Sequence, residues 1–245
     1  MRKTCVLRAF SCAVLMAMSC AVHAQTLTWA GHIWNVTEGG MAGVAPGEPA
    51  NVTIDSNGYL RLRIVKRHNR WTAAELFTTD NMGFGTYQWI VEGDVYRMDP
   101  TTVLGLFLYG PANGIGVDGE DEIDIEFSRW ADTCDCNADF TVYPSTGHRK
   151  QNGNPSWEDD FRARASDLTT ARFEWSSEKI IFTLMKGSHP IGETEDVIKT
   201  ETYTSNRTNI PQSALPVGIN LWCFQHTPAT DQHAVIRDFQ FAPIP

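Results

Sequence analysis

Three acidic residues alternate with apolar residues from Glu122 to Phe127, and this spacing is the clearest chemical signal in the chain. Successive side chains of a β-strand point to opposite faces. Glu122, Asp124 and Glu126 are therefore expected on one face of a strand, and the intervening apolar residues on the face that meets the core. A surface strand whose acids only meet water is the alternative, but acids are depleted in strands and neighbouring like charges repel.

Grouped carboxylates raise one another's pKa, so one can stay protonated while another is ionised. Glycoside hydrolysis needs this division, because one carboxylic acid protonates the leaving oxygen while a second acts as nucleophile or base. Glu122 and Glu126 would have Cα atoms roughly 13 Å apart on a strand. Side chains that lean together can approach the roughly 5–5.5 Å expected of a retaining glycosidase. Asp124 lies between them, where it can hydrogen-bond one carboxyl and tune the pair.

The run from Asp121 to Phe127 resembles the active-site strand of glycoside hydrolase family 16, which includes licheninases, laminarinases, agarases, carrageenases and xyloglucan-active enzymes. The resemblance implies Glu122 as nucleophile, Glu126 as general acid/base and Asp124 as an assisting residue. It also implies a β-jelly roll of two curved antiparallel sheets, with a concave substrate cleft. The uninterrupted spacing is similar to the licheninase and xyloglucan branch, since laminarinase-like members carry one extra residue.

The same resemblance extends more loosely over most of the chain after residue 24, and it implies that side chains of three further strands reach the substrate. The segments that carry it are 74–78, 106–110 and 219–222, and the residues that it implies at the substrate are Glu75, Tyr109, Asn220 and Trp222. Phe77 stands where the family has an arginine, which puts a polar sugar contact from that position in doubt.

Aromatic residues supply the binding part of this interpretation, because the apolar faces of pyranose rings stack on indole and phenol rings. Trp222 shares a strand face with Asn220 and is expected in the groove rather than in the core. Trp130 follows Glu126 by four residues and fits a groove or a core position equally well. Tyr143 resembles a groove tyrosine, and a structural role is the alternative.

The first 24 residues have the composition of a secretory signal peptide. They combine three basic residues with an apolar stretch from Ala9 to Val22, and small residues precede Gln25. We expect residues 1–24 to be cleaved, the protein to be secreted or periplasmic, and residues 25–245 to form a single catalytic β-jelly-roll domain.

The net negative charge of the chain limits the classes of molecule that it is expected to bind. Cleavage would remove three of the 20 basic residues and none of the 29 acidic residues, which leaves a formal charge of −12. Such a charge argues against nucleic acid and membranes, and against strongly anionic polysaccharides unless basic residues cluster locally. A neutral polysaccharide is the expected partner, and the protein is expected to be a monomer.

Three cysteines follow the expected cleavage site, namely Cys134, Cys136 and Cys223. A bond between the first two would be strained at their spacing, so either of them is expected to pair with Cys223 and leave one thiol. Free thiols and a metal site are the alternatives, although no nearby His completes a familiar metal-ligand spacing.

Short alternating segments separated by turn residues predict an all-β sandwich. The clearest segments are 60–64, 87–91 and 234–241. Residues 173–175 and 180–182 resemble a late hairpin of the same family. Asn57-Gly58, ahead of the first segment, is typical of a hairpin turn. Residues 39–49 and 149–160 are expected as loops that either border the cleft or lie on the surface.

The family resemblance also implies a structural calcium on the convex side, with Asp238 and the carbonyl of Gly58 at matching places. An isolated Asp on a last strand is otherwise simply exposed. No cofactor is expected to be required for the chemistry.

Together these observations predict a secreted retaining endo-β-glycosidase that acts on a polysaccharide, with 1,3-1,4- or 1,3-linked β-glucan as the first choice. A transglycosylase acting on β-glucan or xyloglucan would use the same residues and differ only in the acceptor. A non-catalytic glycan-binding module of the same fold is the alternative from another class. Its usual mark is the loss of a catalytic acid, and all three acids are present here.

Overall fold

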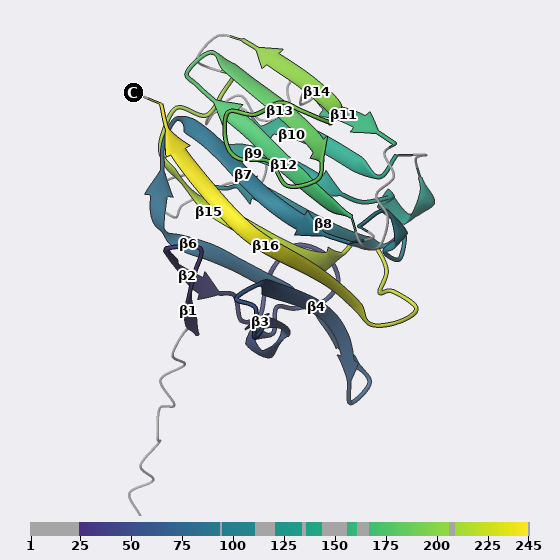
Figure 1. The fold of residues 1–245 in the computed structure, drawn as a ribbon. Helices are drawn as coiled ribbons and strands as arrows, with labels where there is room; N and C mark the ends of the chain where they lie inside the picture. The colour runs from purple at the N-terminus through teal and green to yellow at the C-terminus, as the bar shows by residue number, and fades with distance from the viewer. Residues whose placement is uncertain are drawn as a thin grey trace, which may run out of the picture.

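The computed structural model describes residues 25–93, 95–110, 121–133, 136–143, 156–160, 167–205 and 209–244. The strands form two sheets, one packed on the other (Figure 1), and adjacent strands that pair in them run antiparallel. Among the described residues, no helix has both the length and the apolar character needed to cross a membrane. The predicted all-β jelly-roll sandwich is confirmed.

The groove sheet, named for the groove described below, has the strand order β1-β2-β6-β15-β8-β9-β10-β11. Its strands are β1 (Thr26–Trp29), β2 (His32–Val36), β6 (Ala74–Met82), β8 (Thr102–Leu108), β9 (Glu122–Phe127), β10 (Ala138–Tyr143), β11 (Ser156–Asp159) and β15 (Leu215–Cys223).

The outer sheet has the order β14-β13-β12-β7-β16-β4-β3, and β5 pairs with β4 beside it. In Figure 1 this sheet faces the viewer, with β14 at the top and β16 in yellow across the middle. Its strands are β3 (Val52–Ile54), β4 (Leu60–Arg67), β5 (Arg70–Thr72), β7 (Gly85–Glu92), β12 (Leu168–Trp175), β13 (Lys179–Lys186), β14 (Val197–Thr204) and β16 (Gln232–Pro243). Short 3-10 turns occur at η1 (Pro49–Asn51), η2 (Val95–Arg97) and η3 (Trp130–Asp132).

Aromatic and aliphatic side chains from both sheets fill the space between them. Ile125 of β9 is fully buried. Phe140 of β10 stacks on Phe182 of β13 with ring centroids 4.9 Å apart, and Trp34 of β2 meets Phe239 of β16 edge-on at 5.8 Å. Such pairs add to the stabilisation from apolar burial, so the core fixes which face of each strand remains free.

The three segments that the alternation predicted as strands lie in β4, β7 and β16. The hairpin that the family resemblance implied at 173–175 and 180–182 is the antiparallel pair β12 and β13. The predicted turn at Asn57-Gly58 joins β3 to β4 as an antiparallel hairpin. Gly58 has φ +81° and donates its backbone N–H to the carbonyl of Asp55 at 3.0 Å. The Asp55 side chain accepts from the Asn57 backbone N–H at 2.8 Å, as is typical of an Asx turn.

The prediction of a loop at residues 149–160 is wrong in part. Residues 156–159 form the edge strand β11, which pairs with β10, and residues 149–155 lie outside the described part of the chain. Local sequence does not reveal this strand, because only Trp157 packs against the core while its neighbours are exposed or half-buried. Pairing with β10 decides its conformation.

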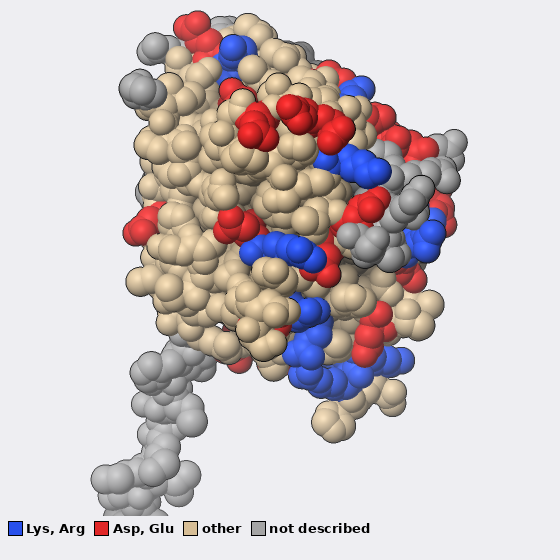
Figure 2. Space-filling view, in the orientation of Figure 1, with Lys and Arg blue, Asp and Glu red and all other residues tan. Residues whose placement is uncertain are grey.

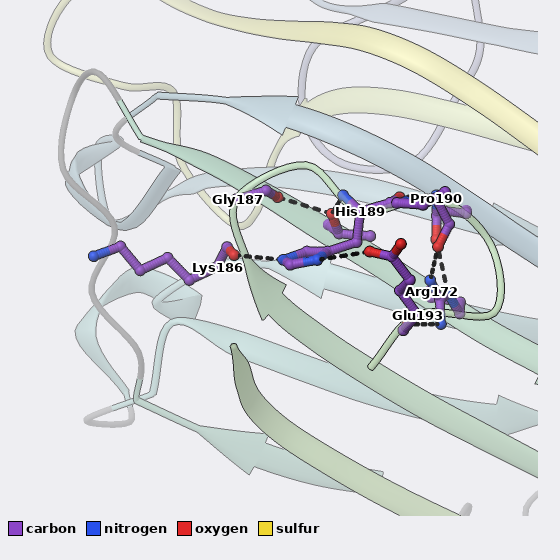
Figure 3. A network of polar contacts seen from close by, with 8 residues as sticks. Arg172, Lys186, Gly187, His189, Pro190 and Glu193 are labelled. Atoms are coloured by element: carbon purple, nitrogen blue, oxygen red, sulfur yellow. Dashed lines mark hydrogen bonds and ion pairs between the residues drawn. The ribbon is translucent and has the colours of Figure 1, made fainter. Parts of the chain in front are cut away.

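A buried arginine fixes a loop against the outer sheet (Figure 3). Arg172 of β12 donates to the carbonyl oxygens of Glu193 at 2.8 Å and Pro190 at 2.9 Å, and to the side-chain oxygen of Gln88 at 2.7 Å. The ring Nε2 of His189 hydrogen-bonds to the Lys186 carbonyl at 2.8 Å. Since each guanidinium nitrogen has an acceptor, the buried charge is compensated by hydrogen bonds, and the network has a structural role.

Charged residues are unevenly spread over the outer-sheet face (Figure 2). Acidic side chains are scattered across the view, whereas the densest group of basic side chains lies beside the end of β4. Lys66, Arg67 and Arg70 are the exposed basic residues of the hairpin between β4 and β5. The groove has a different charge character, as described next.

Candidate active site

Strand β9 presents its two faces as the alternation predicted. Its apolar residues Ile123, Ile125 and Phe127 have no exposed surface and belong to the core between the sheets. Glu122, Asp124 and Glu126 point the other way and line a groove on the groove sheet, with a volume of about 700 Å³. Burial of the apolar face therefore orients all three acids.

Every residue expected to contact the substrate lines this same groove. The residues from the sequence are Glu75, Tyr109, Glu122, Asp124, Glu126, Trp130, Tyr143, Asn220 and Trp222. They come from four strands, namely β6, β9, β10 and β15, and from the segments that follow β8 and β9. Among the described lining residues there is no Lys, Arg or His, so this described lining carries only acidic formal charges.

Strand register sets the neighbours of the first two acids. Glu122 lies opposite Tyr143 of β10, and Asp124 lies between Phe107 of β8 and Thr141 of β10. Asp124 is buried and hydrogen-bonds to Glu122. Burial raises the pKa of Asp124 well above its usual range, and the negative charges of Glu122 and Glu126 raise it further. In its protonated form Asp124 donates this hydrogen bond to the Glu122 carboxylate.

Glu126 also has a raised pKa, of about 8. Burial is the largest cause, followed by the negative charges of Asp139 and Glu122. Because this pKa lies above neutrality, Glu126 carries a proton at pH 7. The site thus contains a protonated acid on the strand that also carries Glu122, which is the arrangement required of a general acid.

The glutamate on β6 is joined to the centre of the sheet by hydrogen bonds. Thr37 donates its hydroxyl to Oε1 of Glu75 at 3.0 Å, and Nδ2 of Asn220 donates to Oε2 at 3.4 Å. Asn220 in turn accepts from the backbone N–H of Gly105 through Oδ1 at 3.1 Å. Burial raises the pKa of Glu75 although both hydrogen bonds oppose the shift. The amide of Asn220 is held with a fixed orientation.

Aromatic residues flank the acids on the β6 and β8 side. Phe77 meets Phe107 edge-on with centroids 5.5 Å apart, and Tyr109 lies 6.4 Å from Phe77 and 6.3 Å from Phe107. Phe77 thus presents an apolar ring at the position where the sequence resemblance would have an arginine. A pyranose ring can stack on such a surface.

A second aromatic cluster lies around the end of β15. Trp130 meets Trp222 with centroids 6.2 Å apart and Phe224 at 5.0 Å, both nearly edge-on. Trp130 is half-buried and has φ +48°, a left-handed conformation that is unusual for a bulky residue. Backbone strain of this kind is maintained where surrounding contacts enforce it and often marks a functional site.

Phe107 was not among the residues expected at the groove, whereas residues 39–49 were expected either to border the cleft or to lie on the surface. Phe107 lines the groove, and so do Gly40 to Gly43, which places this part of the 39–49 segment at the cleft. A side chain at Gly43 would meet Trp222 and the backbone of Cys223, so the segment approaches β15 very closely. The alternation along β8 is the signal that could have identified Phe107, whereas the approach of Gly43 has no local signal.

The expected pairing with Cys223 is wrong. Cys223 is a buried free thiol, and burial, followed by the charge of Asp99, raises its pKa to about 12. Cys136 is disulfide-bonded, and its partner lies outside the described residues, as does Cys134. The reason is alternation along β15, because Trp222 occupies the groove face and Cys223 therefore points between the sheets.

The predicted calcium ligands lie near the same end of β4. Leu60 pairs with Ile236, so Gly58 and Asp238 each lie two residues along the chain from this pair. The Gly58 carbonyl accepts from Nε1 of Trp29 at 3.1 Å, and the Asp238 carboxylate accepts from the Phe239 backbone N–H at 3.0 Å.

Calcium takes six to eight oxygen ligands. No cluster of three or more His, Cys, Asp or Glu residues able to hold a metal occurs in the described parts of the chain. One carboxylate and one carbonyl form only part of a calcium site, and calcium binding stays a prediction.

Of the comparisons with known proteins, the one with solved structures gave matches. No protein-family model matches the sequence, and no curated protein matches it.

Solved structures match over most of their length. A Bacillus licheniformis β-glucanase has a TM-score of 0.65 and 21% identity, covering 89% of this chain and 95% of its own. A glycoside hydrolase family 16 endo-glucanase from Bacteroides ovatus has a TM-score of 0.64 and 9% identity, covering 85% and 94%. A Mycobacterium tuberculosis protein described as a pseudo β-1,3-glucanase has a TM-score of 0.59 and 18% identity, covering 84% and 88%. This chain therefore has the β-jelly-roll fold of the glycoside hydrolase family 16 glucanases.

Proposed function

We propose that this protein is a retaining endo-β-glycosidase that hydrolyses a neutral β-glucan. One observation carries the proposal, namely the presence of Glu122 and protonated Glu126 on the groove face of a single strand. A nucleophile and a general acid must be together at the scissile bond, and grouping them on one rigid strand provides this. The fold shared with glucanases supports the same conclusion.

In the first step the Glu122 carboxylate attacks the anomeric carbon while Glu126 delivers its proton to the leaving glycosidic oxygen. The bond between the anomeric carbon and that oxygen breaks as the bond to Glu122 forms. Asp124 donates a hydrogen bond to Glu122, which orients the nucleophile. The shortened polysaccharide leaves with the proton from Glu126.

In the second step a water molecule attacks the covalent intermediate, and the Glu126 carboxylate takes its proton. The charge of Glu122 is one cause of the raised pKa of Glu126. Formation of the glycosyl ester removes that charge, so the pKa of Glu126 falls in the intermediate. The acid of the first step thereby becomes a better base for the second.

The groove supports a neutral polysaccharide as substrate. Its described lining contains acids, an amide and aromatic rings but no cation, so a carboxylated or sulfated polymer would meet uncompensated repulsion. The aromatic residues that line the groove suit a chain that extends beyond the cleaved bond. We propose a 1,3-1,4- or 1,3-linked β-glucan.

Replacing the nucleophile tests the mechanism. We expect Glu122→Ala to lose at least 10³-fold in kcat on the best β-glucan, because no covalent intermediate forms. Added azide should restore turnover of an activated aryl glycoside and give a glycosyl azide of inverted configuration. The product is identified by NMR. Glu195→Gln, an exposed acid away from the groove, is the matched control and should keep full activity.

Wild-type-like activity in Glu122→Ala would refute the nucleophile assignment. If the unmodified protein binds glycans by calorimetry but releases no reducing sugar from any β-glucan, it is a binding module instead. Transfer of glucan chains to added acceptor oligosaccharides, in place of hydrolysis, would identify a transglycosylase.

We also propose that residues 1–24 direct export and are removed, so that the working enzyme begins near Gln25. The composition of this segment supports the proposal. N-terminal sequencing of the exported protein tests it directly.

A further inference from the structure

A fourth acid lies beside the general acid on the neighbouring strand. The register of β9 and β10 places Asp139 directly opposite Glu126. Directly opposed residues in antiparallel strands have Cβ atoms about 4.5–5.5 Å apart and project from the same face. Asp139 is only 8% exposed, so water screens its interaction with Glu126 weakly.

The Asp139 carboxylate is held by two hydroxyl donors. Ser156 of β11 donates to Oδ1 at 2.7 Å, and Thr141 of β10 lies 3.3 Å from Oδ2. Hydrogen bonds to the charged form favour ionisation. They oppose the effect of burial, which is larger and leaves the pKa of Asp139 raised above its usual value. These donors also restrict the side chain, so its distance from Glu126 is set by three paired strands.

The other described charges around Glu126 do not compensate Asp139. On β9 itself the charge of Glu122 acts in the same direction as that of Asp139, and the pKa of Asp124 is raised well above its usual range. On the β8 side Gly105 has no side chain, and Glu75 lies two strands further across the sheet.

Behind Asp139, the residue opposite it on β11 is Glu158. Arg129, which follows β9, directs its guanidinium to the Met98 carbonyl at 3.0 Å and to Asp132 at 3.4 Å. Lys199, from the outer sheet, pairs with Glu201 at 2.9 Å and approaches Asp159 at 3.9 Å. No Lys, Arg or His occurs in β6, β15, β8, β9, β10 or β11.

We propose that Asp139 is a positioning residue for the catalytic proton: its fixed negative charge keeps Glu126 protonated in the resting enzyme and so sets the alkaline limit of activity. This inference rests on the proposed function. The pKa of Glu126 supports it, because after burial Asp139 is the largest cause of the shift, ahead of Glu122. Asp124 is not among the causes of that shift, and of the two charges that raise the pKa of Glu126 the larger contribution comes from the adjacent strand.

The test is the pH dependence of kcat/KM for Asp139→Asn on the best β-glucan. Asn keeps the shape and one acceptor oxygen but removes the charge. We expect the alkaline limb, where the general acid loses its proton, to move to lower pH by roughly one unit or more. At the pH optimum of the variant, kcat should remain within a few-fold of wild type.

Two further variants test whether the shift of the alkaline limb depends on the position of the removed charge or only on the total charge. Glu158→Gln removes an equal charge one strand further from Glu126, and its alkaline limb should move by less than half as much. Ser156→Ala removes a donor to Asp139, disfavours its ionised form, and should move the limb in the same direction as Asp139→Asn but less.

A direct titration of the Glu126 carboxyl by ¹³C NMR gives a readout that does not need turnover. We expect its pKa to be lower in Asp139→Asn than in the unmodified protein, with circular dichroism and melting temperature confirming a folded variant. An unchanged pKa, an equal shift in Glu158→Gln, or an activity loss at every pH without a shift would overturn the proposal. A lowered pKa in a protein without glycosidase activity would support the role of Asp139 and refute the proposed function.

Discussion

Gly105 shows how a missing side chain can shape a catalytic site. In the sheet register it lies between Asn220 of β15 and Glu126 of β9. A Cβ atom there would collide with Oδ1 of Asn220, which now accepts from the Gly105 backbone N–H at 3.1 Å. Because glycine has no Cβ, the Asn220 amide can hydrogen-bond both to the Gly105 backbone and to Glu75.

Gly105→Ala should therefore damage the site more than the fold. The added methyl would displace Asn220 and break its hydrogen bond to Glu75, and we expect kcat/KM to fall at least tenfold, a loss of about 1.4 kcal/mol in transition-state stabilisation. Gly83→Ala, where a Cβ would have open space, is the control and should be nearly neutral. Equal activity in the two variants would contradict this role for Gly105.

At the scale of the element, burial of the apolar face of β9 in the core fixes the orientation of its acidic face. The apolar face of this strand is fully buried, whereas Glu122 and Glu126 are half-buried at the groove. A strand has period two, so the apolar residues can enter the core only if the acids face the groove. Stability and catalysis therefore depend on opposite faces of the same six residues.

Shortening a core residue of β9 should cost stability. We expect Ile125→Ala to lower the free energy of unfolding by about 2–5 kcal/mol, through lost apolar burial and the cavity that remains. Ile54→Ala, at an Ile that is 40% exposed on β3, is the matched control and should cost much less. Urea denaturation measures both, and a small loss at Ile125 would show that β9 is not anchored by its apolar face.

At the scale of the whole molecule, the groove concentrates acids that folding makes harder to ionise. Burial raises the pKa of Glu75, Asp124, Glu126 and Asp139. A carboxyl with a raised pKa binds its proton more tightly in the folded state, so its ionisation destabilises the fold as pH rises. For Glu126 this cost develops between the ordinary value of 4.5 and about 8. These groove acids thus lower stability at neutral and alkaline pH.

Removing one groove acid should recover part of that stability. Glu126→Gln should raise the melting temperature relative to wild type by more at pH 8.5 than at pH 4.5, because only the wild-type residue ionises over this range. Calorimetric scans at the two pH values measure the difference, with Glu195→Gln as an exposed control. A pH-independent difference would mean that the pKa of Glu126 is not raised by folding.

The sequence alone determined which side chains of an element share a face. Alternation along residues 122–127 identified the acidic face of β9, and Asn57-Gly58 identified the hairpin between β3 and β4. These are local properties, because backbone period and turn conformation depend on neighbouring residues. Together with the family resemblance, they were enough to predict the jelly roll and the nine groove residues that had been singled out.

Only the tertiary structure decided which strands lie side by side and in what register. Asp139 sits opposite Glu126 because β10 pairs with β9, and residues 156–159 form β11 because they pair with β10. The free thiol of Cys223 and the approach of Gly43 to Trp222 likewise depend on segments distant in sequence. Register results from packing of the whole sandwich rather than from any one segment, so the charges that surround Glu126 could not be read from the sequence of β9.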